Sequence, residues 1–286
     1  MPAAPFTPPD LTAMQRTLAL QRWWFDPVYF GMDNTCTGRP ALFVGNHTLM
    51  GFLDAPLMLT EIYAQTGRYL RGLGDHIHFR IPGWRDMLRR FGAVPGTRDD
   101  CHQLMQQGAS LLVYPGGGRE VMKNRGENYQ LLWKKRAGFA RMALEHGYDI
   151  IPFAAVGADD AFDIRYDSQD FQQSRLGQWL IRQGWMERYL RGGDAFIPWV
   201  TGLGFSPLPR PERLYFSFAP ALTMATGQIT DETIWNLREQ VKTSIEQEIQ
   251  RLLTYRESDR SSFSWRRPLT QPTLIRAGAH ADADLK

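Results

Sequence analysis

Short apolar runs alternate along the chain with segments in which apolar residues recur at helical spacing. Runs typical of buried strands are found at 41–45, 110–114, 149–156 and 213–218. Segments typical of helices are found at 51–63, 85–91, 99–107, 130–146 and 230–255. Because strands that alternate with helices build parallel sheets, this pattern predicts an α/β fold with a mostly parallel mixed sheet flanked by helices.

The clearest predicted helix is the segment 230–255. Thr230 can cap its start, and its apolar residues form one stripe, made of Ile234, Leu237, Val241, Ile245, Ile249 and Leu252. Periodicity weakens after the third predicted strand, yet no change in composition marks a second domain. We therefore predict a single domain over 1–255, with its motifs within 40–160, followed by a polar and frayed tail over 256–286.

The composition is typical of a globular protein and argues against a nucleic-acid binder. A formal net charge of +3 over 286 residues is too small to indicate a nucleic-acid binder, and the hydrophobic share of 43% is ordinary for a globular protein. The two cysteines, Cys36 and Cys101, have no metal-site or disulfide spacing, so a reducing compartment fits. We expect no signal peptide in 1–10, which lacks a basic region followed by an apolar core. We also expect no transmembrane helix, because no run of about 18 apolar residues occurs.

Aromatic residues with interleaved arginines gather in two segments, 23–30 and 179–199. Tryptophan and arginine together are typical of a membrane interface. The alternative is an ordinary core from which arginines extend to the surface. We expect both segments to flank the pocket as an aromatic-rich, membrane-facing surface of a peripheral protein on the cytoplasmic face of a membrane.

The run from Leu42 to Asp54 joins a predicted strand to a polar turn that carries one histidine, His47. Histidine has the side-chain pKa nearest neutrality, so His47 could take a proton from a hydroxyl and return it. Asp54 could fix the orientation of the imidazole. Taken alone, His47 would more often be structural, and Asp54 would more often be a solvated helix residue.

Three further segments lie near the ends of predicted strands. The loop 92–98 ends in Arg98, which could clamp a phosphate or carboxylate. The segment 114–120 contains three glycines, whose backbone N–H groups could hold a phosphate or stabilise an oxyanion. It lacks the Gly-Lys-Ser/Thr ending of a nucleotide-binding loop. The strand at 149–156 ends in a glycine turn and two acids, Asp159 and Asp160.

These four blocks, in this order, resemble the four motifs of the glycerolipid acyltransferase superfamily over roughly 40–160. Asn46-His47 followed by Asp54 is similar to the His–Asp motif of that superfamily. The loop 92–98 matches its Gly-x-x-Pro-x-x-Arg motif. The remaining two motifs correspond to the segment 114–120 and to the pair Ile151-Pro152.

The third block has the form Tyr-Pro-Gly-Gly-x-Arg-Glu. Together with Arg-Gly-Glu at 125–127 and Val-Gly-x-Asp-Asp at 156–160, it most resembles the plant phytyl ester synthase and diacylglycerol acyltransferase-like branch. The resemblance implies a glycerolphosphate-acyltransferase-like fold. It also implies that an acyl thioester, acyl-CoA or an acyl carrier protein, donates a fatty acyl group to a lipid hydroxyl.

In this resemblance His47 is the catalytic base, and Asp54 orients it. The residues implied in substrate or oxyanion binding are Asn46, Arg98, Gly116, Gly117, Gly118, Arg119 and Glu120. No metal and no cofactor beyond the acyl thioester co-substrate is implied. The expected partners are the acyl thioester, the lipid alcohol and a membrane surface, with an acyl carrier protein as a further candidate and no nucleic acid.

Two departures from the superfamily pattern change these expectations. Six residues instead of four separate His47 from Asp54, and on one continuous helix seven steps would hold them about 10 Å apart. The pair therefore requires a helix that begins near Gly51; otherwise Glu120 or another acid orients His47. Gly116 stands where the pattern has glutamate, which favours a neutral alcohol, such as diacylglycerol or a long-chain alcohol, over a phosphate-bearing acceptor.

Three alternatives stay open at this point. The acceptor is a lysophospholipid such as lysophosphatidate, or the protein is a thioester or lipid hydrolase in which His47 activates water, or it is a non-catalytic lipid-binding module. A metal site at His76 and His78, which would share one face of a strand, has no obvious third ligand.

Overall fold

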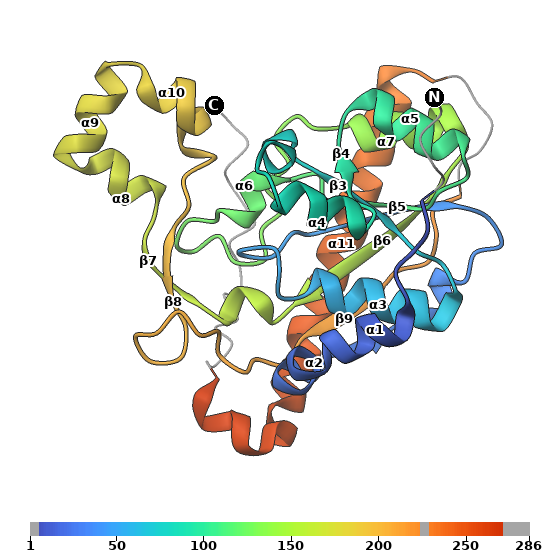
Figure 1. Cartoon of the computed structure of the whole chain (residues 1–286), viewed down its shortest axis with the longest axis horizontal. Helices are drawn as coiled ribbons and strands as arrows, with labels where there is room; N and C mark the ends of the chain where they lie inside the picture. The colour runs from blue at the N-terminus through green and yellow to red at the C-terminus, as the bar shows by residue number, and fades with distance from the viewer. Residues whose placement is uncertain (1–5, 224–228, 271–286) are drawn as a thin grey trace.

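The computed structural model describes residues 6–223 and 229–270 of the chain. Its centre is a seven-stranded sheet with the order β1-β9-β6-β2-β5-β3-β4 (Figure 1). The strands are β1 (Val28–Phe30), β2 (Ala41–Gly45), β3 (Arg71–Gly74), β4 (Val94–Pro95), β5 (Leu111–Val113), β6 (Asp149–Val156) and β9 (Tyr215–Phe218). Neighbouring strands are parallel except for β6 and β9. The predicted α/β fold with a mostly parallel mixed sheet is confirmed.

Helices cover both faces of this sheet. One face is covered by α1 (Leu11–Thr17), α2 (Ala19–Phe25) and α3 (Ala55–Thr66), and the other by α5 (Arg98–Gln106), α7 (Gly138–His146) and α11 (Asp231–Asp259). Leu42 and Phe43 of β2 point to opposite faces, and both are fully buried in these two layers. A strand buried on both faces has no polar alternation, which is why the central strands are continuous apolar runs in the sequence.

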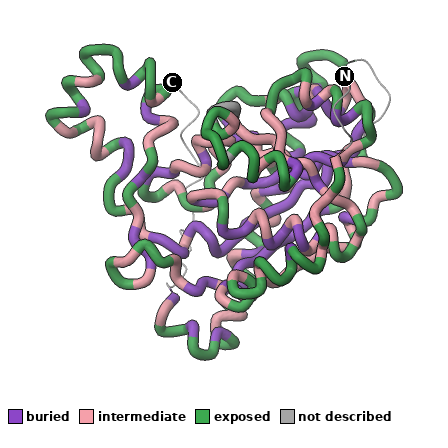
Figure 2. Tube along the Cα trace, viewed as in Figure 1, coloured by how far each residue is buried: buried purple, intermediate pink, exposed green. Residues whose placement is uncertain are grey.

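A second, two-stranded antiparallel sheet carries a group of short helices that projects from the core (Figure 1). We call it the α8–α10 projection; in chain order it comprises β7 (Asp163–Tyr166), α8 (Ser168–Gln173), α9 (Arg175–Arg182), α10 (Trp185–Leu190), η4 (Arg191–Gly193) and β8 (Trp199–Thr201). Its helices pack mainly on one another. Figure 2 shows the central strands buried and most of the projection exposed.

The remaining short elements are η1 (Met32–Thr35), η2 (His76–Arg80), α4 (Trp84–Arg90), α6 (Gly118–Val121), η3 (Ala158–Asp160) and η5 (Arg260–Leu269). They lie in loops that the sequence pattern did not resolve into elements, apart from α4, which was predicted at 85–91. Within the two described ranges, no helix has the length and apolar character needed to cross a membrane.

Two predicted helices begin later in the structure than in the sequence pattern. The helix predicted over 130–146 starts only at Gly138, because the backbone is left-handed at Lys134, with a φ of +50°, which interrupts a helix. In the loop before it, the N–H of Leu132 donates to the Glu120 carboxylate (2.8 Å). The helix predicted over 51–63 starts at Ala55.

The end of the chain also differs from the prediction. Instead of fraying at Arg256, α11 continues to Asp259, and Phe263 of the following η5 is fully buried. Arg256 is itself buried and forms ion pairs with Asp160 and with Glu212 (2.6 Å). The polar segment that follows Tyr255 is therefore part of the packed structure, because Arg256 forms ion pairs with acids from distant parts of the chain. Residues 271–286 lie outside the described residues.

Replacing Arg256 by methionine should destabilise the fold by about 3–5 kcal/mol, because it removes the guanidinium shared by the Asp160 and Glu212 carboxylates. The matched control is Lys242→Met on the same helix, whose pair with Glu246 (3.8 Å) lies at the surface and contributes about 0.3–0.5 kcal/mol. Urea unfolding followed by circular dichroism measures both variants. A loss of less than about 1 kcal/mol for Arg256→Met would show that the end of α11 is not anchored by this cluster.

Candidate active site

The predicted site around His47 lies at the carboxyl edge of the sheet, between the ends of β2 and β5. β2 leads into α3 on one face, whereas β5 leads through α6 into α7 on the other face. Connections that leave adjacent parallel strands toward opposite faces open a crevice, and ligands of α/β proteins bind there. The rings of His47 and Tyr114 stack at this point, with centroids 4.0 Å apart and 17° between their planes.

Gly51 makes room for the His47 ring. A Cβ atom on Gly51 would lie 2.5 Å from Cε1 of His47, and the backbone of Gly51 has a φ of +66°. The residue therefore has to be glycine on both steric and backbone grounds. The helix break predicted near Gly51 is present, because the chain turns here and α3 begins only after Asp54.

The His47 imidazole is held as a neutral group. Burial, together with the charges of Lys123 and His78, lowers its pKa to about 3. Its Nδ1 atom is buried and has no hydrogen-bond partner among the described residues, and no hydrogen bond joins the ring to Asp54 or to Glu120. A neutral imidazole has a lone pair free to accept a proton, which is the state that a general base requires.

Asp54 is the N-cap of α3. Its carboxylate accepts a hydrogen bond from the N–H of Ala55 (2.8 Å), and the side chain is buried. Burial raises the pKa of Asp54 to about 6, and the negative charge of Asp159 acts in the same direction. The direct His47–Asp54 hydrogen bond considered from the sequence is therefore not formed, although the turn that it required is present.

Glu120 holds the backbone of the His47 loop rather than the ring. Its two carboxylate oxygens accept the N–H groups of His47 (2.9 Å) and Leu132 (2.8 Å), and burial raises its pKa to about 7. A Cβ atom on Gly116 would lie 2.1 Å from Cδ of Glu120. The glycine at 116 and the acid at 120 therefore depend on each other, because the Glu120 side chain occupies the space beside Gly116.

Asn46 has a structural role, so its prediction as a substrate-binding side chain is corrected. Its side-chain oxygen accepts the N–H of Ala155, and its amide nitrogen donates to the carbonyl of Ala155, both at 2.8 Å. The side chain is fully buried. It joins the end of β2 to β6, and both of these contacts are to the protein's own backbone.

The two predicted anion-binding arginines are paired with acids. Arg98 begins α5, and its guanidinium lies 2.8 Å from the Glu145 carboxylate. Arg119 on α6 pairs with Glu127 and lies 3.5 Å from Asp194. Because each positive charge is met by a carboxylate of the protein, the arrangement does not present either arginine as a free cation at the site.

The glycine turn after β5 supplies backbone donors. Within the part of the chain that the structure describes, the N–H groups of Gly118 and Arg119, at the first turn of α6, have no hydrogen-bond acceptor. Gly117 accommodates the left-handed bend before them, with a φ of +51°. The Gly116 carbonyl accepts a hydrogen bond from Arg136. The turn thus combines a fixed shape with free N–H groups of the kind that stabilise an oxyanion.

A buried ion pair beside the site was not predicted from the sequence. The Lys123 ammonium lies 2.5 Å from the Asp159 carboxylate, and both side chains are inaccessible to solvent. Asp159 also accepts the N–H groups of Leu49 (2.6 Å) and Tyr129 (2.8 Å), so it ties the loop after His47 to the loop after α6. The signal was present as the Val-Gly-x-Asp-Asp segment at 156–160, but nothing local in the sequence names Lys123 as the partner.

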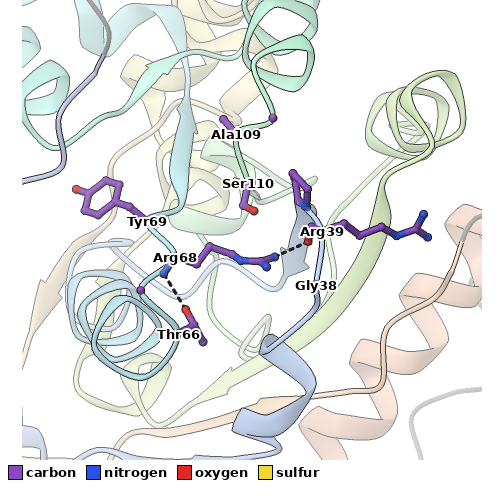
Figure 3. A pocket seen from close by; sticks show the side chains of 10 residues that line it. Gly38, Arg39, Thr66, Arg68, Tyr69, Ala109 and Ser110 are labelled. Atoms are coloured by element: carbon purple, nitrogen blue, oxygen red, sulfur yellow. Dashed lines mark hydrogen bonds between the residues drawn. The ribbon is translucent and has the colours of Figure 1, made fainter.

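A polar cavity of about 410 Å³ lies at the opposite, amino edge of the sheet (Figure 3). Arg68 donates there to the carbonyl of Arg39 (2.8 Å), and its backbone N–H donates to the Thr66 hydroxyl (3.0 Å). The cavity shares none of its lining residues with the His47 site. It is therefore separate from the predicted chemistry.

The histidines considered as metal ligands do not lie on a strand. Residues 76–80 form the 3-10 helix η2, so the shared strand face expected for His76 and His78 is absent. The side chain of His76 lies outside what the structure describes. Among the described residues, no group of three or more histidine, cysteine, aspartate or glutamate side chains is arranged to hold a metal ion.

Comparison with known proteins gives a consistent family assignment. The family model described as Acyltransferase matches residues 27–156. "Phytyl ester synthase 2, chloroplastic" of Arabidopsis thaliana is 32% identical over 241 residues, which cover 77% of this chain and 33% of that protein. The "DGAT1/2-independent enzyme synthesizing storage lipids" of Bos taurus is 31% identical over 160 residues, 56% of this chain and 46% of that protein.

The chain thus spans between a third and a half of the length of these two relatives. Among solved structures, the 1-acyl-sn-glycerophosphate acyltransferase PlsC from Thermotoga maritima aligns with a TM-score of 0.49 and 16% identity. The alignment covers 83% of this chain and 79% of that one.

Replacing Gly51 by alanine should displace the His47 ring and cost more stability than backbone strain alone. The matched control is Gly67→Ala, because Gly67 has the same φ of +66° but open space around its Cα. Both variants pay about 1 kcal/mol for the left-handed backbone, and only Gly51→Ala adds the clash with His47. Urea unfolding and the NMR signal of the His47 Cε1–H group measure the two effects. Equal losses, with an unmoved His47 signal, would contradict the steric role of Gly51.

Proposed function

The chain carries an acyltransferase domain of the glycerolipid family, and on this premise we propose that it transfers a fatty acyl group from an acyl thioester to the hydroxyl of a neutral lipid alcohol. Diacylglycerol and long-chain alcohols are the acceptors of this class. The observation that carries the proposal is the neutral His47 imidazole, which lies at the carboxyl ends of β2 and β5 and stacks on Tyr114, next to the glycine turn after β5.

In the proposed reaction His47 removes the proton from the acceptor hydroxyl as the oxygen attacks the carbonyl carbon of the thioester. The N–H groups of Gly118 and Arg119 receive the oxyanion, an effect worth about 3–4 kcal/mol for each well-placed donor. The tetrahedral intermediate then expels the thiolate, and the His47 imidazolium returns the proton to the sulfur. The new ester and the free thiol leave, and no covalent enzyme intermediate is needed.

Asp54 has the role of a nearby carboxylate that stabilises the imidazolium when it forms. Its proximity is supported by its electrostatic effect on Tyr114, the residue whose ring stacks on His47: the Asp54 charge, after burial, raises the pKa of the Tyr114 phenol. In the resting structure Asp54 caps α3, so its contribution arises only when His47 becomes charged. Transition-state charge of this kind is the one that preorganised groups stabilise best.

A neutral acceptor is favoured over lysophosphatidate by the ion pairs of the predicted anion binders. The Arg98 guanidinium faces Glu145, and that of Arg119 faces Glu127. An incoming phosphate would meet guanidinium groups whose charge a carboxylate of the protein already neutralises, which weakens its attraction to them. A neutral hydroxyl requires no such exchange.

The proposed setting is the surface of a membrane in a reducing compartment, with the protein bound peripherally on its cytoplasmic side. Cys36 and Cys101 are both free thiols, which fits such a compartment. Acyl-CoA and acyl-loaded acyl carrier protein are both candidate donors, because the two present the same thioester and differ only in the group that bears the thiol.

Replacing His47 by alanine should lower the rate of acyl transfer by about 10²–10⁴-fold, because the base is lost while the His47 backbone bond to Glu120 is kept. The control is His102→Ala on α5, which should leave transfer unchanged. Purified protein is assayed with acyl-CoA or acyl carrier protein and with diacylglycerol, a long-chain alcohol, lysophosphatidate or no acceptor. Undiminished transfer by His47→Ala would refute the mechanism. Thioester loss at full rate without acceptor would identify a hydrolase instead.

The pH dependence of kcat/KM should rise from acid pH and level off above about 6, the pKa of Asp54. Protonation of Asp54 below this pH removes the charge that stabilises the imidazolium, whereas His47, with a pKa of about 3, stays neutral throughout. Glu120 has a pKa of about 7, close to that of Asp54, so the variant Asp54→Asn is needed to show which group causes the rise in rate. This variant should be slow at every pH and lack the rise near pH 6. A rise retained in Asp54→Asn would assign it to another group.

A further inference from the structure

The α8–α10 projection bears apolar side chains that the proposed chemistry does not use. Five large ones on α9 and α10 are each at least 44% exposed: Leu176, Trp179, Ile181, Trp185 and Tyr189. We call these five, together with the three arginines Arg175, Arg182 and Arg188 on the same two helices, the α9–α10 surface. The rings of Trp185 and Tyr189 lie 4.7 Å apart, so two of the aromatics already form a contiguous patch.

These exposed side chains are not part of the small core that the projection forms. Gly177 packs so closely on α8 that a Cβ atom would lie 1.8 Å from the carbonyl oxygen of Phe171. Phe171 in turn stacks on Phe196 at 5.0 Å, and Met186 of α10 is 5% exposed. The inward faces of α9 and α10 are thus filled, and the exposed apolar residues have no partner within the described chain to explain them.

The charge of this surface is positive. Between residues 175 and 191 the chain carries four arginines and one acid, Glu187. Arg191 pairs with Asp75 (2.7 Å). On α9, Trp179 lies on the same face as Arg175 and Arg182, at helical spacings of four and three residues from them, and Leu176 and Ile181 flank this face on its two sides. Arginine beside tryptophan on a short amphipathic helix is the composition of segments that lie in a lipid interface.

The projection stands at the same edge of the sheet as His47. Arg191 bridges to Asp75, which directly follows β3, and Asp194 lies 3.5 Å from Arg119 on α6. The Ser168 hydroxyl, at the start of α8, donates to Asn124 in the loop after α6 (2.8 Å). These contacts join the base of the projection to the loops that follow β3 and β5.

The other aromatic segment, 23–30, is used mainly for packing within the protein. Phe25 is buried, and Tyr29 stacks on Phe216 at 5.1 Å. Trp23 stacks on Trp265 at 5.4 Å, although it remains 56% exposed, and Arg22 beside it pairs with Glu61 (2.9 Å). The two segments have similar compositions, but they differ in how many of their side chains remain available to contact a partner. The α9–α10 surface combines two exposed indoles with three arginines that form no ion pair with any residue the structure describes.

We propose that the α9–α10 surface docks the protein on the surface of a bilayer that contains anionic phospholipid. The indoles of Trp179 and Trp185 enter the interface, and the three arginines face lipid phosphates. The docking presents the carboxyl edge of the sheet, and with it His47, to lipids in the bilayer. Only this last consequence rests on the proposed acyl transfer.

Co-sedimentation with sucrose-loaded vesicles tests the docking, using phosphatidylcholine alone or with about one third phosphatidylglycerol. Wild type should bind the anionic vesicles and lose binding as salt is raised. The double variant Trp179→Ser/Trp185→Ser should bind at least about tenfold more weakly. The matched control Trp235→Ser alters a tryptophan on α11 that is 39% exposed, and it should bind as wild type. Circular dichroism checks that each variant is folded.

The charge contribution is tested with the triple variant Arg175→Gln/Arg182→Gln/Arg188→Gln. It should lose about 100-fold in binding to anionic vesicles, given about fivefold for each basic residue near such a surface. Vesicle binding by the double tryptophan variant equal to that of wild type would overturn the proposal. So would a wild-type dimer that the double variant converts to monomer in sedimentation velocity, with no vesicle binding by either, because a second copy would then be the occupant.

His47→Ala separates this proposal from the acyl transfer. The substitution lies outside the α9–α10 surface, so vesicle binding by His47→Ala should equal that of wild type whatever its effect on turnover. Normal docking without transfer by wild type on any acceptor would refute the proposed function and leave the docking intact. Transfer that depends on His47 in a protein that binds no vesicles would refute the docking and leave the proposed function intact.

Discussion

The buried carboxylate of Glu120 is the contact on which the arrangement of the site depends. It accepts the N–H of His47 at the end of β2 and the N–H of Leu132 in the loop before α7. Its side chain fills the space beside Gly116, which cannot carry a Cβ atom there. The position of the His47 backbone and the shape of the glycine turn therefore have one common cause, and the same carboxylate fixes the loop before α7 at Leu132.

Burial also sets the protonation states around His47. Removing charged groups from water raises the pKa of Asp54 and Glu120 and lowers that of His47. Lys123 and Asp159 remain an ion pair in the same interior because they neutralise each other. The result is a neutral imidazole near two carboxyl groups, Asp54 and Glu120, whose pKa values lie near neutral pH, a combination typical of sites in which a proton is moved and the resulting charge is stabilised.

Aromatic residues are buried in the core but exposed in the α8–α10 projection. In the core, aromatic rings such as Phe43 and Phe153 fill the space between the sheet and its helices. In the projection, Trp179 and Trp185 stay exposed on helices of eight and six residues. Surplus apolar surface next to a catalytic edge is useful when the substrate itself resides in a bilayer.

The sequence by itself determined the elements whose burial is uniform and placed the candidate base His47 at the end of a strand. Continuous apolar runs predicted β2, β5 and β6, and the strand end placed His47 at a sheet edge, because backbone periodicity and burial are recorded locally. Only the tertiary structure decided which side chains meet. Asn46 forms hydrogen bonds with Ala155, and Arg98 forms an ion pair with Glu145, although the partners are far apart in the sequence. These pairings depend on how the sheet and the helices pack, and no local pattern of residues contains that information.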